Sequence, residues 1–273
     1  MKKLLLAAAA GLTLSIGGVA GAADLARPVY KAPPPPPPVY SWTGCYVAGG
    51  GGYKMWNIDH DALDPFGFLA NNEGTSGGRG WLATAQVGCD YQFNSSFVIG
   101  AFADWDWTNA NGDYNERFSP LAVSQIGNLK ERWAWAVGGR IGYLVTPNLL
   151  SYVAGGYTEA NFDGVNFVQA AAGFAVPLGA ITGITLGQRT FKGWFVSGGT
   201  EYALSLFPGL FWKNEYRFAQ FDTRTDPLVC TAAVVCAPGV PVGSDRAKLT
   251  QQSVRTELVW RFNWGTGPVY AKY

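Results

Sequence analysis

Stretches of about ten residues with alternating side-chain character recur along this chain, and they restrict its fold more than any other feature. A tilted strand of that length spans the apolar core of a bilayer. The stretches predict an all-β fold, an eight-stranded antiparallel up-and-down transmembrane β-barrel. The eight lie at 43–56, 82–93, 96–108, 132–145, 148–160, 192–204, 210–221 and 252–264.

The gaps between these stretches alternate strictly between short and long. The short gaps, 94–95, 146–147 and 205–209, consist of turn-forming residues. Outer-membrane barrels have short periplasmic turns and longer external loops, so the alternation predicts both topology and orientation. The long gaps, predicted as external loops, lie near 57–81, 109–131, 161–191 and 222–251.

Within the strands, charged side chains fall on one parity and aromatic side chains on the other. In 210–221, for example, Lys213 and Arg217 alternate with Trp212 and Tyr216. A charge that faces lipid at the membrane centre costs about 2–4 kcal/mol, so the charged parity must face the lumen. This argument predicts a polar lumen network of Asp104, Asp106, Arg140, Glu201, Lys213, Glu215, Arg217, Arg255, Glu257 and Arg261.

Eight strands leave a lumen that is only wide enough for its own side chains. Charges buried there have to be paired and hydrogen-bonded. We therefore expect a salt-bridged network that closes the lumen, and a structural role in the cell envelope. A narrow channel for small solutes is the alternative, whereas the strand number excludes a wide pore. The same parity places Arg132 in the lumen with Arg140.

The segment 164–187 carries no charge and allows three interpretations. We expect the third external loop, flanked by strands that extend above the membrane. The segment is long enough for a transmembrane helix, but its polar residues, its glycines and Pro177 argue against a helix. A turn at 177–179 would instead add two strands and make ten, which is the alternative to eight.

The N-terminal region carries signals for export. Residues 1–23 have a basic start, an apolar run and small residues, as in a secretory signal peptide, and cleavage after Ala22 or after Ala23 is equally compatible. Residues 24–41 contain six consecutive prolines, which favour an extended periplasmic linker. The barrel domain then covers 42–273, and the expected location is the bacterial outer membrane, reached through the periplasm.

Catalytic and nucleic-acid-binding functions find little support. A net charge of +1 gives no basic field for nucleic acid. His60 is the only histidine, and it lies among aspartates in a long gap, which predicts a solvated acidic loop. The glycines at 49–52 lack the Lys-Ser/Thr of a phosphate loop and suit a tightly curved strand. We expect no enzyme activity, no metal and no cofactor; a lipid-modifying enzyme that uses His60 is the least favoured alternative.

Four cysteines fit an oxidising compartment. Cys230 and Cys236 are close enough in sequence for a small looped disulfide. Cys45 and Cys89 lie near the periplasmic ends of neighbouring strands and share the outward parity, so they are candidates for a cross-strand disulfide. A register shift of one residue would remove this second pair.

Four short motifs carry a resemblance to a known family. They are AADL before the proline run, WTGCYV at 42–47, KNEYR at 213–217 and VWRFNW at 259–264. They resemble the small outer-membrane immunogenic or porin-family proteins with an OmpA-like β-barrel. The resemblance implies a surface antigen with an envelope-structural role, and some such proteins are credited with porin or haemin-binding activity. The insertion signal could end on Phe262, Trp264 or Tyr273.

We expect the protein to act as a monomer. Its expected partners are outer-membrane lipids, lipopolysaccharide and the barrel-insertion machinery.

Overall fold

The computed structural model describes residues 41–118, 123–170, 177–232 and 236–262. The predicted signal peptide, the linker up to residue 40, Trp264 and Tyr273 lie outside these ranges. The strands of the described chain are β1 (Gly44–Leu63), β2 (Leu69–Gln92), β3 (Phe97–Thr108), β4 (Asn111–Phe118), β5 (Val123–Thr146), β6 (Leu149–Phe162), β7 (Val165–Gln169), β8 (Ile181–Leu186), β9 (Arg189–Ala203), β10 (Leu210–Phe221), β11 (Arg224–Cys230) and β12 (Pro241–Phe262).

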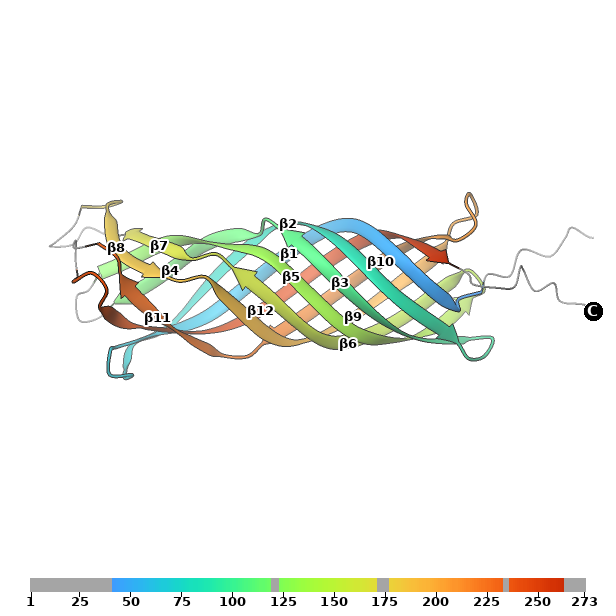
Figure 1. Ribbon diagram of the computed structural model, residues 1–273, viewed down its shortest axis with the longest axis horizontal. Helices are drawn as coiled ribbons and strands as arrows, with labels where there is room; N and C mark the ends of the chain where they lie inside the picture. Colours follow the sequence, from blue (N-terminus) through green and yellow to red (C-terminus); the bar gives the residue numbers. More distant parts are fainter. Residues whose placement is uncertain (1–40, 119–122, 171–176, 233–235, 263–273) are drawn as a thin grey trace, which may run out of the picture. The chain divides into compact units, whose positions relative to one another are not determined.

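Eight of these strands close into a ring, which we call the membrane ring. Its order is β1, β2, β3, β5, β6, β9, β10 and β12, and β12 pairs back to β1 (Figure 1). Every pairing in the ring is antiparallel. Closure pairs both edges of the sheet, as a strand structure in lipid requires. The predicted eight-stranded barrel is therefore confirmed.

The long connections contain more strand than the sequence predicts. β1 continues to Leu63 and β2 starts at Leu69, so only residues 64–68 separate them. Beyond the membrane ring, β4, β7, β8 and β11 take the places of β3, β6, β9 and β10. They form a second closed circuit with the ends of β1, β2, β5 and β12, which we call the external ring.

The external ring forms because the long segments keep the two-residue period of a strand. Their inward side chains, such as Ile58, Tyr114 and Phe167, are buried in an apolar interior. A solvated loop would leave these side chains in water, which the hydrophobic effect opposes. The sequence pattern thus continues through the segments that we predicted as loops.

The segment 164–187 contains the hairpin of the ten-strand alternative, but it does not enlarge the membrane ring. β7 and β8 are antiparallel, and the amide of Ala180 closes a turn by donating to the carbonyl of Pro177 at 3.1 Å. The two strands pair with β5 and β11 in the external ring. In the described part of the chain, no helix is long and apolar enough to span a membrane.

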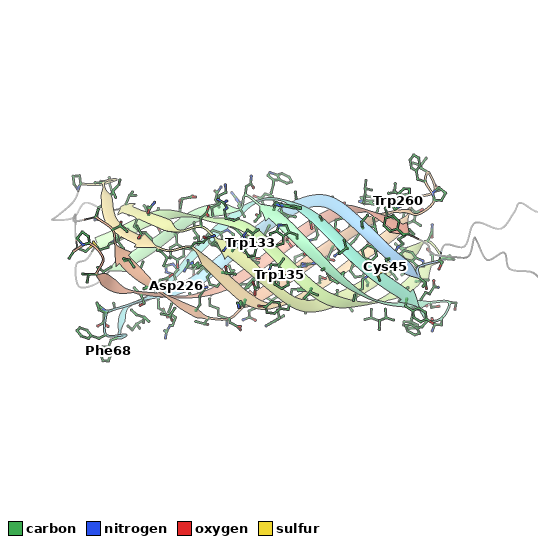
Figure 2. All side chains as sticks on the ribbon, viewed as in Figure 1. Cys45, Phe68, Trp133, Trp135, Asp226 and Trp260 are labelled. Atoms are coloured by element: carbon green, nitrogen blue, oxygen red, sulfur yellow. A yellow bond between two sulfur atoms is a disulfide. The ribbon has the colours of Figure 1, made fainter. Side chains whose placement is uncertain are left out.

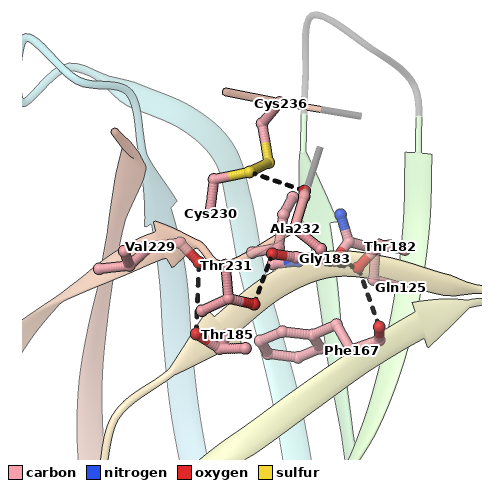
Figure 3. The surroundings of a disulfide bond; sticks show 11 residues. Gln125, Phe167, Thr182, Gly183, Thr185, Val229, Cys230, Thr231, Ala232 and Cys236 are labelled. Atoms are coloured by element: carbon pink, nitrogen blue, oxygen red, sulfur yellow. Dashed lines mark hydrogen bonds between the residues drawn. A yellow bond between two sulfur atoms is a disulfide. The ribbon is translucent and has the colours of Figure 1, made fainter. Parts of the chain in front are cut away.

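Two disulfides lie at opposite ends of the barrel. Cys45 and Cys89 face each other in the β1–β2 register. Cys230 and Cys236 close a short loop after β11 (Figure 3). Next to this bond, the amide of Thr231 donates to the carbonyl of Gly183 at 2.7 Å, which fastens the loop to β8.

Outward aromatic side chains form two groups that bracket the apolar wall. Trp133 and Trp135 belong to the group nearer the external ring, and Trp260 lies near Cys45 at the periplasmic end (Figure 2). Trp and Tyr concentrate at membrane–water interfaces. The two groups therefore mark the external and periplasmic interfaces of the membrane ring.

The glycines at 49–52 allow β1 to approach β12 closely. A Cβ atom built on Gly50 would lie 2.0 Å from the carbonyl oxygen of Thr256, whereas one on Gly49 would lie 3.9 Å from that of Thr84. Only the first of these contacts is a clash. The seam that closes the barrel therefore depends on Gly50.

Valine at Gly50 will destabilise the barrel, and valine at Gly49 will not. Because the clash at Gly50 is with backbone, the free energy of unfolding should fall by about 1–3 kcal/mol. Urea titration of the refolded protein in detergent measures this. Equal stability of the Gly50→Val and Gly49→Val variants would contradict a tight β1–β12 seam.

Candidate functional site: the polar lumen

All ten residues of the predicted lumen network lie inside the barrel and are buried. Strand parity places them there, since the neighbours of each residue along its strand face lipid. Two groups of ion pairs result. We call them the periplasmic cluster and the central cluster.

The periplasmic cluster is a closed square of two arginines and two carboxylates from four strands. Arg140 (β5) donates from Nη1 to Glu201 (β9) at 3.2 Å and from Nε to Asp90 (β2) at 2.9 Å. Arg261 (β12) donates to the same two carboxylates at 2.6 Å each. Each arginine thus bridges two strands, and the square ties opposite walls of the barrel together.

Aromatic rings lie against both arginines of this square. The Arg140 guanidinium lies 4.8 Å from the centre of the Tyr46 ring and 5.1 Å from that of Tyr152. Arg261 lies 5.0 Å from the ring of Trp42, whose side chain is fully buried. Cation–π contacts of this kind strengthen when water is excluded.

The central cluster extends the ion pairs toward the external end. Arg217 donates to Asp104 at 2.7 Å and 3.1 Å, and it pairs with Glu215 at 2.9 Å. Arg255 pairs with Asp106 at 2.9 Å. The remaining pairs of the cluster are Arg255–Asp104 at 3.5 Å, Lys213–Glu257 at 3.2 Å, Lys213–Glu215 at 3.5 Å, Lys54–Glu131 at 3.0 Å and Lys54–Asp106 at 3.3 Å.

Little free volume remains among these side chains. The cavity beside Lys54, Asp106 and Arg255 has a volume of about 10 Å³, which is room for about one water molecule. Above the cluster, the ring of Phe162 contacts those of Trp56 and Phe191, with centroid distances of 5.6 Å and 5.7 Å. The described lumen is therefore filled by side chains at several levels.

Three charged members of the network were missing from the prediction: Lys54, Asp90 and Glu131. Lys54 and Asp90 share the inward parity of β1 and β2, so extending the parity test to these strands would have found them. Glu131 is different. A register shift between Glu131 and Trp133 turns Glu131 inward and leaves Arg132 on the outer surface, where it pairs with Asp163 at 3.5 Å. The predicted inward position of Arg132 is therefore wrong.

His60 does not lie in a solvated loop, which corrects the prediction. It is 5% exposed inside the external ring, and its ring stacks on Tyr114 at 4.4 Å. Its Nε2 lies 3.0 Å from Ser76 Oγ, and its Nδ1 lies 3.8 Å from Asp245 Oδ1. Arg189 and Tyr114 donate to Asp245 Oδ2 at 2.5 Å and 2.6 Å. We call these five residues the Asp245 cluster.

Ser76, His60 and Asp245 are the residue types of a serine-hydrolase triad, but their surroundings favour a structural role. Ser76 is 2% exposed, and its hydroxyl accepts the Asn115 amide at 3.2 Å. Burial raises the pKa of Tyr114, so its hydroxyl stays protonated and keeps donating to Asp245. The cluster joins five strands of the barrel. Among the described residues, no group of His, Cys, Asp and Glu side chains could hold a metal ion.

Comparison with known proteins supports the resemblance seen in the sequence. The 31 kDa outer-membrane immunogenic protein of Brucella melitensis biotype 1 is 28% identical over 232 residues, covering 82% of this chain and 89% of that protein. The protein of the same name from Brucella suis biovar 1 matches to the same extent. No protein-family model matches the chain. The predicted relation to outer-membrane immunogenic proteins and the outer-membrane location are confirmed.

Among solved structures, the outer membrane protein OprG of Pseudomonas aeruginosa aligns with a TM-score of 0.47 and 11% identity, covering 81% of this chain and 97% of its own. The attachment invasion locus protein Ail of Yersinia pestis aligns with a TM-score of 0.32 and 9% identity, covering 78% and 99%. The barrel assignment rests on the closed strand ring and not on these alignments.

Proposed function

We propose that this outer-membrane β-barrel acts as a closed structural protein of the cell envelope, and that its external ring is exposed at the cell surface. The observation that carries the proposal is the filled lumen. Its charges pair with one another across the barrel, and aromatic rings lie on both sides of them. A protein with this interior holds its strands in a fixed ring and offers solutes no continuous path.

The exposed external tips support the surface role. Phe66 is 85% and Phe68 is 72% exposed at the turn between β1 and β2. Asp64 holds this turn by accepting the amides of both phenylalanines, at 2.9 Å and 2.8 Å. The name of the Brucella relative describes an immunogenic protein. We propose that this chain is likewise immunogenic and that it is recognised as an antigen through its external ring.

The packing of the lumen supports neither a solute channel nor an enzyme, and we propose that the protein is neither. The periplasmic cluster and the aromatic layer block the path that a narrow porin needs. A lipid-modifying enzyme would need substrate at Ser76 and His60, which are buried. We also propose that the protein acts as a monomer inserted by the barrel-insertion machinery.

Planar-bilayer recordings test the closed lumen. Purified protein, verified as folded by its heat-dependent shift in gel migration, should give no stable, discrete conductance steps. A general porin recorded in the same bilayers serves as the positive control. Reproducible steps of one size from the folded protein would overturn the closed-lumen proposal and favour a narrow channel.

A further inference from the structure

A groove on the outer wall of the barrel suggests a binding site that the closed-lumen function does not involve. It has a volume of about 520 Å³ and crosses β12, β1, β2, β4 and β5, with Met55, Asn57, Gly77, Arg79, Asp113 and Asn128 among its lining residues. Pockets of this size hold small organic ligands. The groove lies outside the lumen, so it is open to the surroundings of the barrel.

Strand register explains why the wall is hollow here. In one outward row, Asn57, Gly77, Asp113 and Asn128 are consecutive partners across four strands. Gly77 lies in the middle of this row and has no side chain. A Cβ atom at Gly77 would already lie 3.0 Å from Asn57 Oδ1. The groove therefore exists because glycine occupies this position among polar neighbours.

The groove is at the level of lipid headgroups. Arg79 in β2 lies two residues above Trp81 on the same outward face, a step of about 7 Å along a strand. The Trp81 ring makes an edge contact with Tyr53 at 5.3 Å, and both rings belong to the external aromatic group. Aromatic side chains at this interface mark the boundary between acyl chains and headgroups. The acyl chains of a lipid in the groove would descend past Trp81.

The side chains of the groove suit a sugar that carries phosphate. The side-chain amides of Asn57 and Asn128 can donate to and accept from sugar hydroxyls, and the carboxylate of Asp113 can accept from them. Arg79 recognises phosphate through its planar set of donors. Among the described residues, Arg79 pairs with no carboxylate, so its charge is available to a ligand.

We propose that this groove binds the phosphorylated sugar headgroup of a glycolipid in the outer leaflet. Arg79 contacts the phosphate, the row of Asn57, Asp113 and Asn128 contacts the sugar, and Gly77 provides the space. A soluble sugar phosphate has the same headgroup chemistry, and the test below separates the two sources.

Native mass spectrometry of the protein released from detergent tests the proposal. The protein is titrated with a glucosamine disaccharide lipid that carries two phosphates and six acyl chains. Arg79→Gln should weaken binding about tenfold, since it removes a charge-assisted hydrogen bond. Gly77→Gln should weaken it at least as much by filling the groove. The dephosphorylated lipid should bind the native protein about as weakly as the phosphorylated lipid binds Arg79→Gln.

Lys192→Gln is the matched control. Lys192 is also an outward cation two residues before a tryptophan, Trp194, but it pairs with Glu159 at 3.8 Å and is not part of the groove. Its variant should bind within twofold of the native protein. An equal loss in Lys192→Gln, or unchanged binding in Arg79→Gln and Gly77→Gln, would overturn the site. Competition by glucosamine 1-phosphate at concentrations equal to those of the lipid would overturn the lipid source and assign the groove to soluble sugar phosphates.

Discussion

Replacing Arg140 with methionine should lower the free energy of unfolding by about 3–5 kcal/mol. Arg140 is paired with both Asp90 and Glu201 inside the lumen, and all three side chains are almost fully buried. Without Arg140, two carboxylates share the single cation Arg261 away from water. The cost comes mainly from these uncompensated charges and not from lost volume, because methionine retains much of the arginine stem.

The measurement is urea titration in detergent, combined with the temperature of the heat-dependent gel shift. Arg132→Met is the control, because its exposed pair with Asp163 should contribute less than about 1 kcal/mol. Adding Asp90→Asn to Arg140→Met should recover part of the lost free energy of unfolding, since it removes one of the two uncompensated carboxylate charges. If Arg140→Met is no less stable than Arg132→Met, the lumen charges do not hold the barrel closed.

Replacing Asp245 with leucine should open the external ring and leave the membrane ring intact. The change removes the acceptor shared by Tyr114 and Arg189, and it leaves the buried Arg189 with Asp226 at 3.9 Å as its remaining carboxylate neighbour. Leaving a buried charge without its ion-pair partner costs about 3–5 kcal/mol. The cost is confined to the external strands because the ion pairs of the membrane ring do not involve Asp245.

Limited proteolysis and hydrogen exchange measure this local opening. Cleavage and exchange in β4, β11 and the external part of β12 should rise by about 100-fold or more, while the heat-dependent gel shift stays as in the native protein. Asp61→Asn is the matched control, because Asp61 pairs with Arg246 on the outer surface of the same strands at 2.6 Å. Loss of the gel shift in Asp245→Leu would show that the two rings unfold as one unit.

The membrane part of the fold was predictable because lipid and lumen impose opposite chemistry on successive residues. This alternation located eight strands and all ten proposed lumen residues. It failed where the backbone departs from regular register. The irregularity beside Glu131 exchanges the faces of Glu131 and Arg132, and one-dimensional parity cannot detect such a shift.

The Asp245 cluster was not predictable for a different reason. His60, Ser76, Tyr114, Arg189 and Asp245 come from five strands, and their sequence separations follow from how the external strands pair. Their segments alternate like the membrane strands, but without the lipid-facing aromatics that made the membrane strands recognisable. The long gaps between recognisable strands therefore predict loops, whereas in the structure these segments pair with one another.

The replacement of β3, β6, β9 and β10 by β4, β7, β8 and β11 has a consequence for how such a protein can vary. At each replacement, one strand of the membrane ring ends and a separate strand of the external ring begins. A change in the length of an external strand therefore need not shift the register of the neighbouring strand in the membrane ring. Because side chains alternate, a hairpin arm lengthened by two residues keeps its inward and outward faces, whereas one residue exchanges them. Variants of the external surface should therefore differ by an even number of residues in each strand of a hairpin, and the turn at Pro177–Ala180 should accept an inserted peptide for display on the cell.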